Sequence, residues 1–263
     1  MFILIQKLLP KHFISRLVGI LADSENVFLK TVFINLFDLF YRIDTSEAVR
    51  KNKNDYRNFN DFFTRSLEEG ARPIRGRISS PADGRVADLG RINENTLIQS
   101  KKYKYKVQEL LAEETDEFNQ GSFLSIYLAP HNYHRVHVPR AAELSRASYL
   151  PGELFSVNSE TAGALPDLFT RNERLVCRFI TDGGPMAEIL VGAMLVAGIK
   201  PVWLDSPYKP KLEVSTNLNR RFQQGDELGQ FQMGSTVILV FSEPLDFLVQ
   251  QGEEIKVGQA ITK

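Results

Sequence analysis

The sequence predicts an α+β protein, in which N-terminal amphipathic helices precede a mainly antiparallel β domain. Apolar residues before residue 42 recur at helical spacing, whereas short β-branched runs separated by Gly, Pro and Asp turns follow residue 75. There is no alternating strand–helix pattern and no phosphate-cradling glycine loop. With 263 residues and 43% hydrophobic content, the chain can form one compact core with a smaller appendage.

The first helices are predicted within residues 1–41. In residues 11–22 the apolar side chains fall on one helical face, and residues 26–41 repeat the pattern with many aromatic side chains: Phe13, Leu17, Ile20, Leu21, Val32, Phe33, Leu36, Phe37, Phe40. Lys7, Lys11 and Arg16 precede the first acidic residue, Asp23. A basic amphipathic start is typical of an interfacial membrane anchor. It is equally compatible with an ordinary helix pair packed on the core.

The first five residues are apolar, but Gln6, Lys7 and Pro10 break the run. A signal peptide needs a longer unbroken apolar run, and a spanning helix needs about 20 apolar residues. We therefore expect neither of these in this segment.

Residues 42–75 are charged, and we expect them to be largely helical up to Arg72-Pro73-Ile74. Strands are predicted in the apolar runs after that point: from Val86 onward and over residues 124–128, 175–180, 188–196 and 236–241. Near the end, residues 223–228 (QQGDEL) are echoed by residues 250–255 (QQGEEI). Such turns begin strands in lipoyl-like β sandwiches, and they also arise as two unrelated hairpin turns.

Composition excludes several classes of protein. The 32 basic and 32 acidic residues balance, which argues against a general nucleic-acid binder. Cys177 is the one cysteine, so neither an internal disulfide nor a zinc–thiolate cluster can form. A reducing, cytoplasmic compartment fits, with Cys177 as a small buried apolar residue.

Three of the four histidines fall within seven residues: His131, His134 and His137. Three histidines can hold a catalytic metal, but spacings of three suit neither a strand pair nor a helical pair, so we expect no metal. Packing and surface hydrogen bonding are the plain alternative.

A glycine and a serine, Gly234-Ser235, open the apolar run 236–241. Glycine allows unusual backbone geometry at this bond, and a serine nucleophile needs a base, usually histidine, oriented by a carboxylate. Asp83, in a Pro-Ala-Asp-Gly turn, is a candidate carboxylate. Each signal alone is compatible with a simple turn, and the Gly-x-Ser-x-Gly elbow of α/β-hydrolases is absent.

Taken together, the motifs resemble the phosphatidylserine decarboxylase family, in its membrane-associated, pyruvoyl-dependent bacterial form. The resemblance covers nearly the whole chain. It rests on segments in the family's order: Phe59–Arg65 with Arg72–Ile74, Pro81–Gly84, Tyr133–Pro139, Pro151–Asn158, Arg171–Arg174, Val191–Ala193 and Gly234–Thr236. One departure is Lys102, where the family commonly has glycine, and a positive φ there would strain a lysine.

The resemblance implies that the chain cleaves itself between Gly234 and Ser235. Ser235 would attack the carbonyl of Gly234, with His137 as base and Asp83 as the orienting carboxylate. Elimination and hydrolysis would then convert Ser235 into a covalent pyruvoyl group and release ammonia. The products would be a large chain, residues 1–234, and a small chain, residues 235–263.

The implied activity is decarboxylation of phosphatidylserine to phosphatidylethanolamine and CO2 through a Schiff base with the pyruvoyl group. That group serves in place of pyridoxal phosphate or a metal. His134 matches the proton donor. Tyr133, Phe155 and Asn158 are expected to line the headgroup pocket.

The resemblance also favours the membrane interpretation of the N-terminal helices. Residues 1–75 would form a membrane-associating region and residues 76–263 the catalytic domain. The protein would be peripheral, on the cytoplasmic face of the bacterial cell membrane, with phosphatidylserine and an anionic surface as partners. The large and small chains would stay together, and a homodimer of such heterodimers is left open.

Two other functions remain open on sequence grounds. Ser235, His137 and Asp83 could act on an external ester as a serine hydrolase. A lipoyl-like carrier or scaffold is the alternative from the binding class. Both predict a single intact chain, whereas the decarboxylase predicts two.

Overall fold

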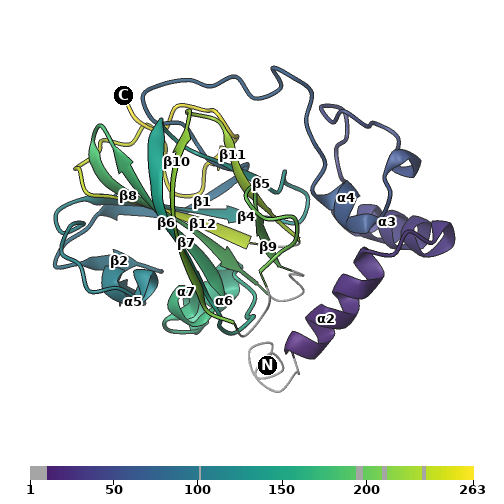
Figure 1. The fold of residues 1–263 in the computed structure, drawn as a ribbon, viewed down its shortest axis with the longest axis horizontal. Helices are drawn as coiled ribbons and strands as arrows, with labels where there is room; N and C mark the ends of the chain where they lie inside the picture. Colours follow the sequence, from purple (N-terminus) through teal and green to yellow (C-terminus); the bar gives the residue numbers. More distant parts are fainter. Residues whose placement is uncertain (1–10, 101, 194–197, 209–211, 233–234) are drawn as a thin grey trace.

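The computed structural model describes residues 11–100, 102–193, 198–208, 212–232 and 235–263. It is a mixed α+β structure with mostly antiparallel sheets and few helices, so the broad fold class is confirmed (Figure 1). The helical elements are α2 Lys11–Ala22, α3 Val27–Tyr41, the 3₁₀ helix η1 Lys53–Asp55, α4 Phe59–Phe63, α5 Val107–Leu111, α6 Ser159–Ala164 and α7 Leu168–Arg171. The strands are β1 Gly84–Arg91, β2 Thr96–Ile98, β3 Lys104–Lys106, β4 Ser122–Leu128, β5 Arg135–His137, β6 Ala142–Leu150, β7 Arg174–Thr181, β8 Gly184–Gly192, β9 Ile199–Pro201, β10 Val214–Phe222, β11 Glu227–Phe231, β12 Ser235–Phe241 and β13 Glu254–Ile255.

Helices α2 and α3 form where the sequence predicts them, and side-chain capping explains where α3 begins. Asn26 accepts hydrogen bonds from the backbone amides of Phe28 and Leu29, which satisfies donors that the first turn leaves free. The prediction of a largely helical segment over residues 42–75 is wrong. Among those residues only η1 and α4 are helical, because apolar side chains there pack as a cluster instead of continuing one helical face.

An eight-stranded sheet in the order β10-β6-β7-β8-β12-β4-β1-β13 forms the centre of the molecule. Every neighbouring pair in it is antiparallel. Strand β12 is buried along its whole length, between β8 and β4. The predicted strands over residues 124–128, 175–180 and 236–241 are confirmed within β4, β7 and β12.

The two faces of this sheet are covered differently. A second sheet, β5-β11-β9, packs on one face, where Val136, Leu228 and Ile199 join Val237 of β12 in one core cluster. Helices α5, α6 and α7 cover the other face, where their apolar residues share a second cluster with Ile238. Because side chains alternate along a strand, β12 contributes odd-numbered residues to the first cluster and even-numbered ones to the second.

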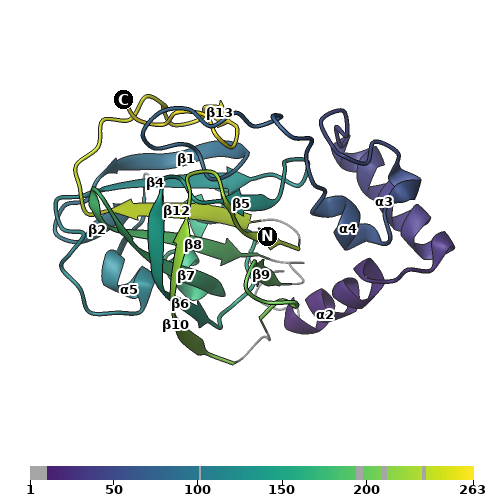
Figure 2. The same ribbon diagram turned by 45° about the horizontal axis from the view of Figure 1, so that its top comes forward.

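The N-terminal helices gather to one side of the sheets (Figures 1 and 2). Their buried residues form a third cluster, which includes Ile34, Tyr56, Phe59 and Phe63. Within the described part of the chain, no helix is both long and apolar enough to cross a bilayer.

The two echoed segments form the same kind of turn. Gly225 and Gly252 both have positive φ, at 87° and 90°, which glycine adopts without strain. In each turn an acidic side chain, Asp226 or Glu253, accepts a hydrogen bond from the backbone amide three residues earlier. The lipoyl-like relationship itself stays a prediction. Lys102 follows residue 101, which lies outside the described residues, so the expectation of strain at Lys102 stays a prediction.

Candidate active site

Ser235 is the first residue of β12 and lies in the middle of the large sheet. It is register-paired with Gly192 of β8 on one side and with Leu128 of β4 on the other. The side chain is fully buried, and its Oγ has no hydrogen-bond partner among the described residues. A buried hydroxyl without a partner is costly, so such a group is a candidate for chemistry. Met233 and Gly234, including the predicted cleavage position, lie outside the described residues.

Two consecutive residues of the Arg171–Arg174 motif hold Gly192 from the other side. The Nδ2 of Asn172 donates to the carbonyl of Gly192 at 2.9 Å, and the amide of Gly192 donates to the carbonyl of Glu173 at 2.9 Å. Asn172 also exchanges hydrogen bonds with the backbone of Phe155, at 3.1 and 2.8 Å. Several motifs that are distant in sequence therefore meet in the strand next to Ser235.

The predicted headgroup residues Phe155 and Asn158 have structural contacts here. Phe155 is buried in the second core cluster, and the guanidinium of Arg171 lies over its ring. Asn158 caps α6 by accepting from the amide of Thr161 at 2.9 Å. Their proposed role toward a substrate stays a prediction.

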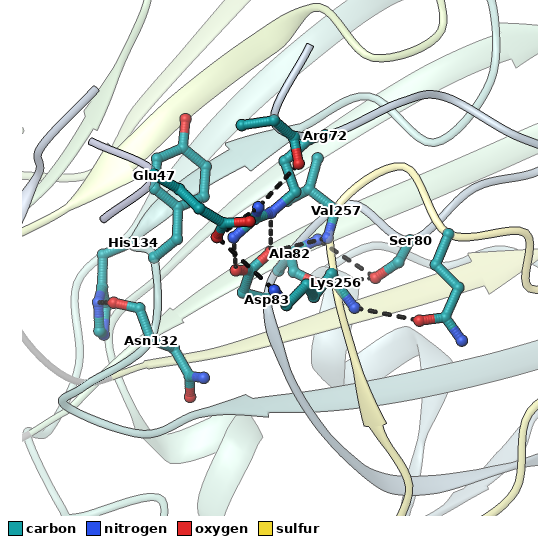
Figure 3. Close-up of polar contacts among 12 residues, drawn as sticks. Glu47, Arg72, Ser80, Ala82, Asp83, Asn132, His134, Lys256 and Val257 are labelled. Carbon is teal, nitrogen blue, oxygen red and sulfur yellow. Dashed lines mark hydrogen bonds and ion pairs between the residues drawn. The ribbon is translucent and has the colours of Figure 1, made fainter. Parts of the chain in front are cut away.

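Asp83 is buried and bound by a guanidinium. The Nε and Nη2 of Arg72 donate to its two carboxylate oxygens at 3.0 and 2.6 Å, and the amide of Val257 donates to Oδ1 at 2.8 Å (Figure 3). Arg72 also donates to Glu47 at 2.9 Å. Two-point recognition of this kind fixes the plane of the carboxylate.

His137 lies beside the segment that carries Asp83, because its amide donates to the carbonyl of Pro81 at 2.8 Å. Its Nδ1 is 2.8 Å from the carbonyl of Gly225, so Nδ1 carries the proton, and Nε2 accepts from the Tyr133 hydroxyl at 3.1 Å. Burial lowers the pKa of His137, which keeps the ring neutral near pH 7. A neutral imidazole with an accepting Nε2 has the protonation state of a general base.

His134 is completely buried between the helical region and the sheets. Its Nδ1 is 2.9 Å from the carbonyl of Asn132 (Figure 3). Its ring centroid lies 4.0 Å from that of Phe63. Nε2 has no partner among the described residues. Burial lowers the pKa of His134 to about 3, so the ring is neutral and Nε2 presents a lone pair.

Arg65 is a residue of this site that the sequence reasoning did not single out by itself. It is 4% exposed, and its Nη2 donates to the carbonyls of His131 and Asn132 at 3.1 and 3.3 Å. The carbonyl of Asn132 thus accepts from both Arg65 and His134. The position of Arg65 within the quoted Phe59–Arg65 motif was the available signal.

Glu173 and Tyr149 were also missed. Both are buried, and the Tyr149 hydroxyl donates to Oε2 of Glu173 at 2.9 Å. Burial raises the pKa of Glu173 to about 7. Glu173 lies in the quoted Arg171–Arg174 motif, but no sequence signal marked Tyr149, which lies near the end of β6.

The three side chains of the predicted triad do not hydrogen-bond to one another among the described residues. Asp83 binds Arg72, His137 binds Gly225 and Tyr133, and the Oγ of Ser235 is unpartnered. Their roles therefore stay predictions. Within the same residues, no group of three or more His, Cys, Asp or Glu side chains is arranged to hold a metal ion.

Comparison with known proteins gives consistent matches. A sequence model described as phosphatidylserine decarboxylase matches residues 59–263, and one described as PSD matches residues 1–41. A phosphatidylserine decarboxylase proenzyme of Alcanivorax borkumensis is 47% identical over 92% of this chain and 88% of its own length. A protein of the same name from Acinetobacter baylyi is 45% identical over 92% of this chain and 87% of its own length. Another from Pseudomonas fluorescens (strain Pf0-1) is 41% identical over 100% of this chain and 98% of its own length.

Proposed function

The chain belongs to the phosphatidylserine decarboxylase family and is a decarboxylase, and we propose that it converts phosphatidylserine to phosphatidylethanolamine and CO2 after cleaving itself between Gly234 and Ser235. The observation that carries this proposal is the buried, unpartnered Oγ of Ser235 at the start of a central strand. The name proenzyme, borne by the relatives, is consistent with a chain that is processed.

In the cleavage step, the Nε2 of His137 takes the proton of Ser235 Oγ, which attacks the carbonyl carbon of Gly234. The ester that results undergoes elimination and hydrolysis, which leaves a pyruvoyl group at position 235. The proton on Nδ1 of His137, fixed by Gly225 at 2.8 Å, supports this assignment because it leaves Nε2 as the accepting nitrogen. Asp83, held by Arg72, contributes its negative charge to the surroundings of His137.

A pyruvoyl group fits position 235, because its methyl group takes the place of a buried side-chain hydroxyl that has no hydrogen-bond partner to lose among the described residues. Once formed, it would supply a ketone that can condense with the substrate amine and act as an electron sink as CO2 departs. His134 would deliver the proton that replaces CO2 on the α-carbon. Since its pKa of about 3 keeps it neutral, His134 must first receive a proton on Nε2 before donating it.

The proposed membrane contact is the exposed apolar surface of α2 and α3. It comprises Leu17, Ile20, Leu21, Val27, Phe28, Leu29, Val32, Leu36, Leu39, Phe40 and Tyr41. A patch of this size on a soluble monomer is unusual, and an amphipathic helix in a bilayer interface buries such a face. We propose that residues 1–75 attach the protein peripherally to the cytoplasmic face of the membrane and that residues 76–263 form the catalytic domain.

Intact mass under denaturing conditions tests the function directly. We expect two chains, residues 1–234 and 235–263, the smaller without a free amino terminus, together with CO2 release from phosphatidylserine. Ser235→Ala and His137→Ala should remain uncleaved, whereas His134→Ala should be cleaved but decarboxylate slowly. A single wild-type chain that hydrolyses esters would instead identify a serine hydrolase.

Vesicle flotation tests the membrane contact separately. Phe28→Ser combined with Phe40→Ser should reduce binding to phosphatidylserine vesicles without reducing the melting temperature, since these side chains are 74% and 72% exposed. Leu248→Ser, at an exposed apolar residue outside the helices, is the control. Unchanged flotation of the double variant would contradict the proposed contact.

A further inference from the structure

Three residues form a row across adjacent strands at the edge of the first core cluster. Ser235 is paired with Gly192, and the amide of Gly192 donates to the carbonyl of Glu173 at 2.9 Å, which continues the pairing of β8 with β7. Residues directly opposite each other in antiparallel strands project to the same face. The side chains of Glu173 and Ser235 therefore project to the same face of the sheet, with Gly192 between them.

Gly192 leaves room for the carboxyl group of Glu173. A Cβ at position 192 would lie 2.9 Å from both Cγ and Oε1 of Glu173, so the glutamate occupies the space over the glycine. Neighbouring strands are about 4.8 Å apart, which puts the carboxyl within roughly 5 Å of the side chain at position 235. Oε2 is held by Tyr149, whose hydroxyl donates to it, and Oε1 is the oxygen over Gly192.

The charge state of Glu173 suits proton exchange. Its pKa of about 7 reflects burial, opposed by the hydrogen bond from Tyr149. Among the described residues packed against it, Tyr149 is the titratable partner, Gly192 has no side chain and Ser235 does not ionise. Glu153 pairs with it through the backbone and has an exposed side chain.

A second buried carboxyl lies on the same face, but it is unsuited to this task. Glu188 is four residues from Gly192 along β8, roughly 13 Å away at the rise of a strand. It is fully buried, and burial raises its pKa well above the ordinary value, so it stays neutral.

We propose that Glu173 forms an ammonium subsite, in which Oε1 binds the primary ammonium of the lipid headgroup and takes one of its protons. This inference rests on the proposed function, because it places the substrate amine at position 235. One N–H bond of the ammonium breaks and an O–H bond forms on Oε1, which leaves a neutral amine with a free lone pair and a neutral carboxyl. The transfer removes two opposite charges from a buried site and makes the nitrogen nucleophilic.

Binding to an unreactive form of the processed enzyme tests the subsite without turnover. Borohydride would reduce the ketone at position 235, and calorimetry at pH 8 would compare dihexanoyl phosphatidylethanolamine with dihexanoyl phosphatidylcholine, whose nitrogen has no proton to donate. We expect Glu173→Gln to weaken binding of the ethanolamine lipid roughly tenfold, the effect of losing a charged hydrogen bond, and to leave the choline lipid unaffected.

Gly192→Ala offers a second variant that keeps the carboxylate but displaces it. The new methyl would collide with the end of the Glu173 side chain, and we expect the same selective loss of ethanolamine-lipid binding. Gly163→Ala is the matched control, since a Cβ there meets nothing within 4 Å.

The pH dependence of kcat/KM gives an independent readout. The carboxylate form is required, so the rate should fall as pH drops below about 7, the pKa of Glu173. Tyr149→Phe removes the hydrogen bond that lowers this pKa, so the acid limb should move to higher pH. Glu173→Gln should abolish that limb and leave a low rate.

The outcomes separate the two proposals. Wild-type protein that stays a single chain or releases no CO2 would overturn the proposed function. The subsite alone would be overturned if the wild-type protein cleaves itself and decarboxylates the lipid, and if the variants at Glu173 and Gly192 keep the wild-type preference for the ethanolamine lipid. If Glu173→Gln is not cleaved, the Gly192→Ala and Tyr149→Phe variants test the subsite in its place. A cleaved Tyr149→Phe enzyme whose kcat/KM falls at the same acidic pH as in the wild type would contradict the proposal.

Discussion

The contact between Tyr133 and His137 leads to a prediction about the rate of self-cleavage. The Nε2 of His137 cannot accept a proton from Ser235 while it accepts the hydrogen bond of the Tyr133 hydroxyl, 3.1 Å away. Tyr133→Phe keeps the ring, which packs against the imidazole at a centroid distance of 5.7 Å, and removes only the hydroxyl. The variant should therefore cleave itself faster than the wild type.

The size of the effect follows from the energy of one hydrogen bond. A neutral intramolecular hydrogen bond contributes about 1 kcal/mol net. If this bond must open before the proton moves, its loss lowers the barrier by a similar amount, which corresponds to roughly a fivefold increase in rate. The measurement is the time course of the 1–234 chain after a pulse of cell-free synthesis, resolved on a denaturing gel.

A matched variant separates this effect from general loosening of the fold. Tyr56→Phe also removes the hydrogen bond of a buried tyrosine, to the carbonyl of Arg50 in the helical region, and should cleave at the wild-type rate. Slower cleavage of Tyr133→Phe would refute the reasoning. It would mean that the Tyr133 hydroxyl carries the proton between Ser235 and His137.

Three further predictions concern the same surroundings. Burial lowers the pKa of His137, and the neutral imidazole is the base. The self-cleavage rate should therefore be independent of pH around 7 and fall only below pH 6.5. A pH series in which the cleavage rate is half-maximal above pH 6.5 would contradict this. Arg65→Met should slow decarboxylation at least tenfold with cleavage intact, because the Asn132 carbonyl that fixes His134 loses a hydrogen-bond donor. Arg65→Lys should recover part of the rate. Equal decarboxylation rates for wild type and Arg65→Met in steady-state assays would exclude this role. Arg72→Met should lower the free energy of unfolding by about 3–5 kcal/mol, because it leaves the buried carboxylate of Asp83 without its ion pair. A decrease below about 1 kcal/mol in a urea titration would show that the ion pair contributes little to stability.

The sequence by itself predicted the elements whose signals are local. Residues 236–241 and 175–180 are β-branched apolar runs bounded by turn residues, and they form β12 and β7. Helix α3 was predicted from apolar spacing alone, and the structure adds the cap at Asn26. These patterns depend on neighbours a few residues away, so they can be read without knowing the fold.

The segment over residues 42–75 shows where local patterns fail. Tyr56, Phe59 and Phe63 have the spacing of one continuous helical face, yet within residues 42–75 only the short elements η1 and α4 are helical. Their rings pack on one another and on α3, and these tertiary contacts outweigh helix propensity.

The motifs also identified the segments of the candidate site, but only the tertiary structure decided which side chains meet. On sequence grounds Asp83 could bind either His137 or Arg72. In the fold it binds Arg72, which donates a hydrogen bond to each of its two carboxylate oxygens. Glu173 was one residue of a quoted motif until the strand register aligned it with Gly192 and Ser235. Register and the choice between competing hydrogen-bond partners depend on residues tens of positions apart, and a one-residue slip would turn Ser235 to the other face of the sheet.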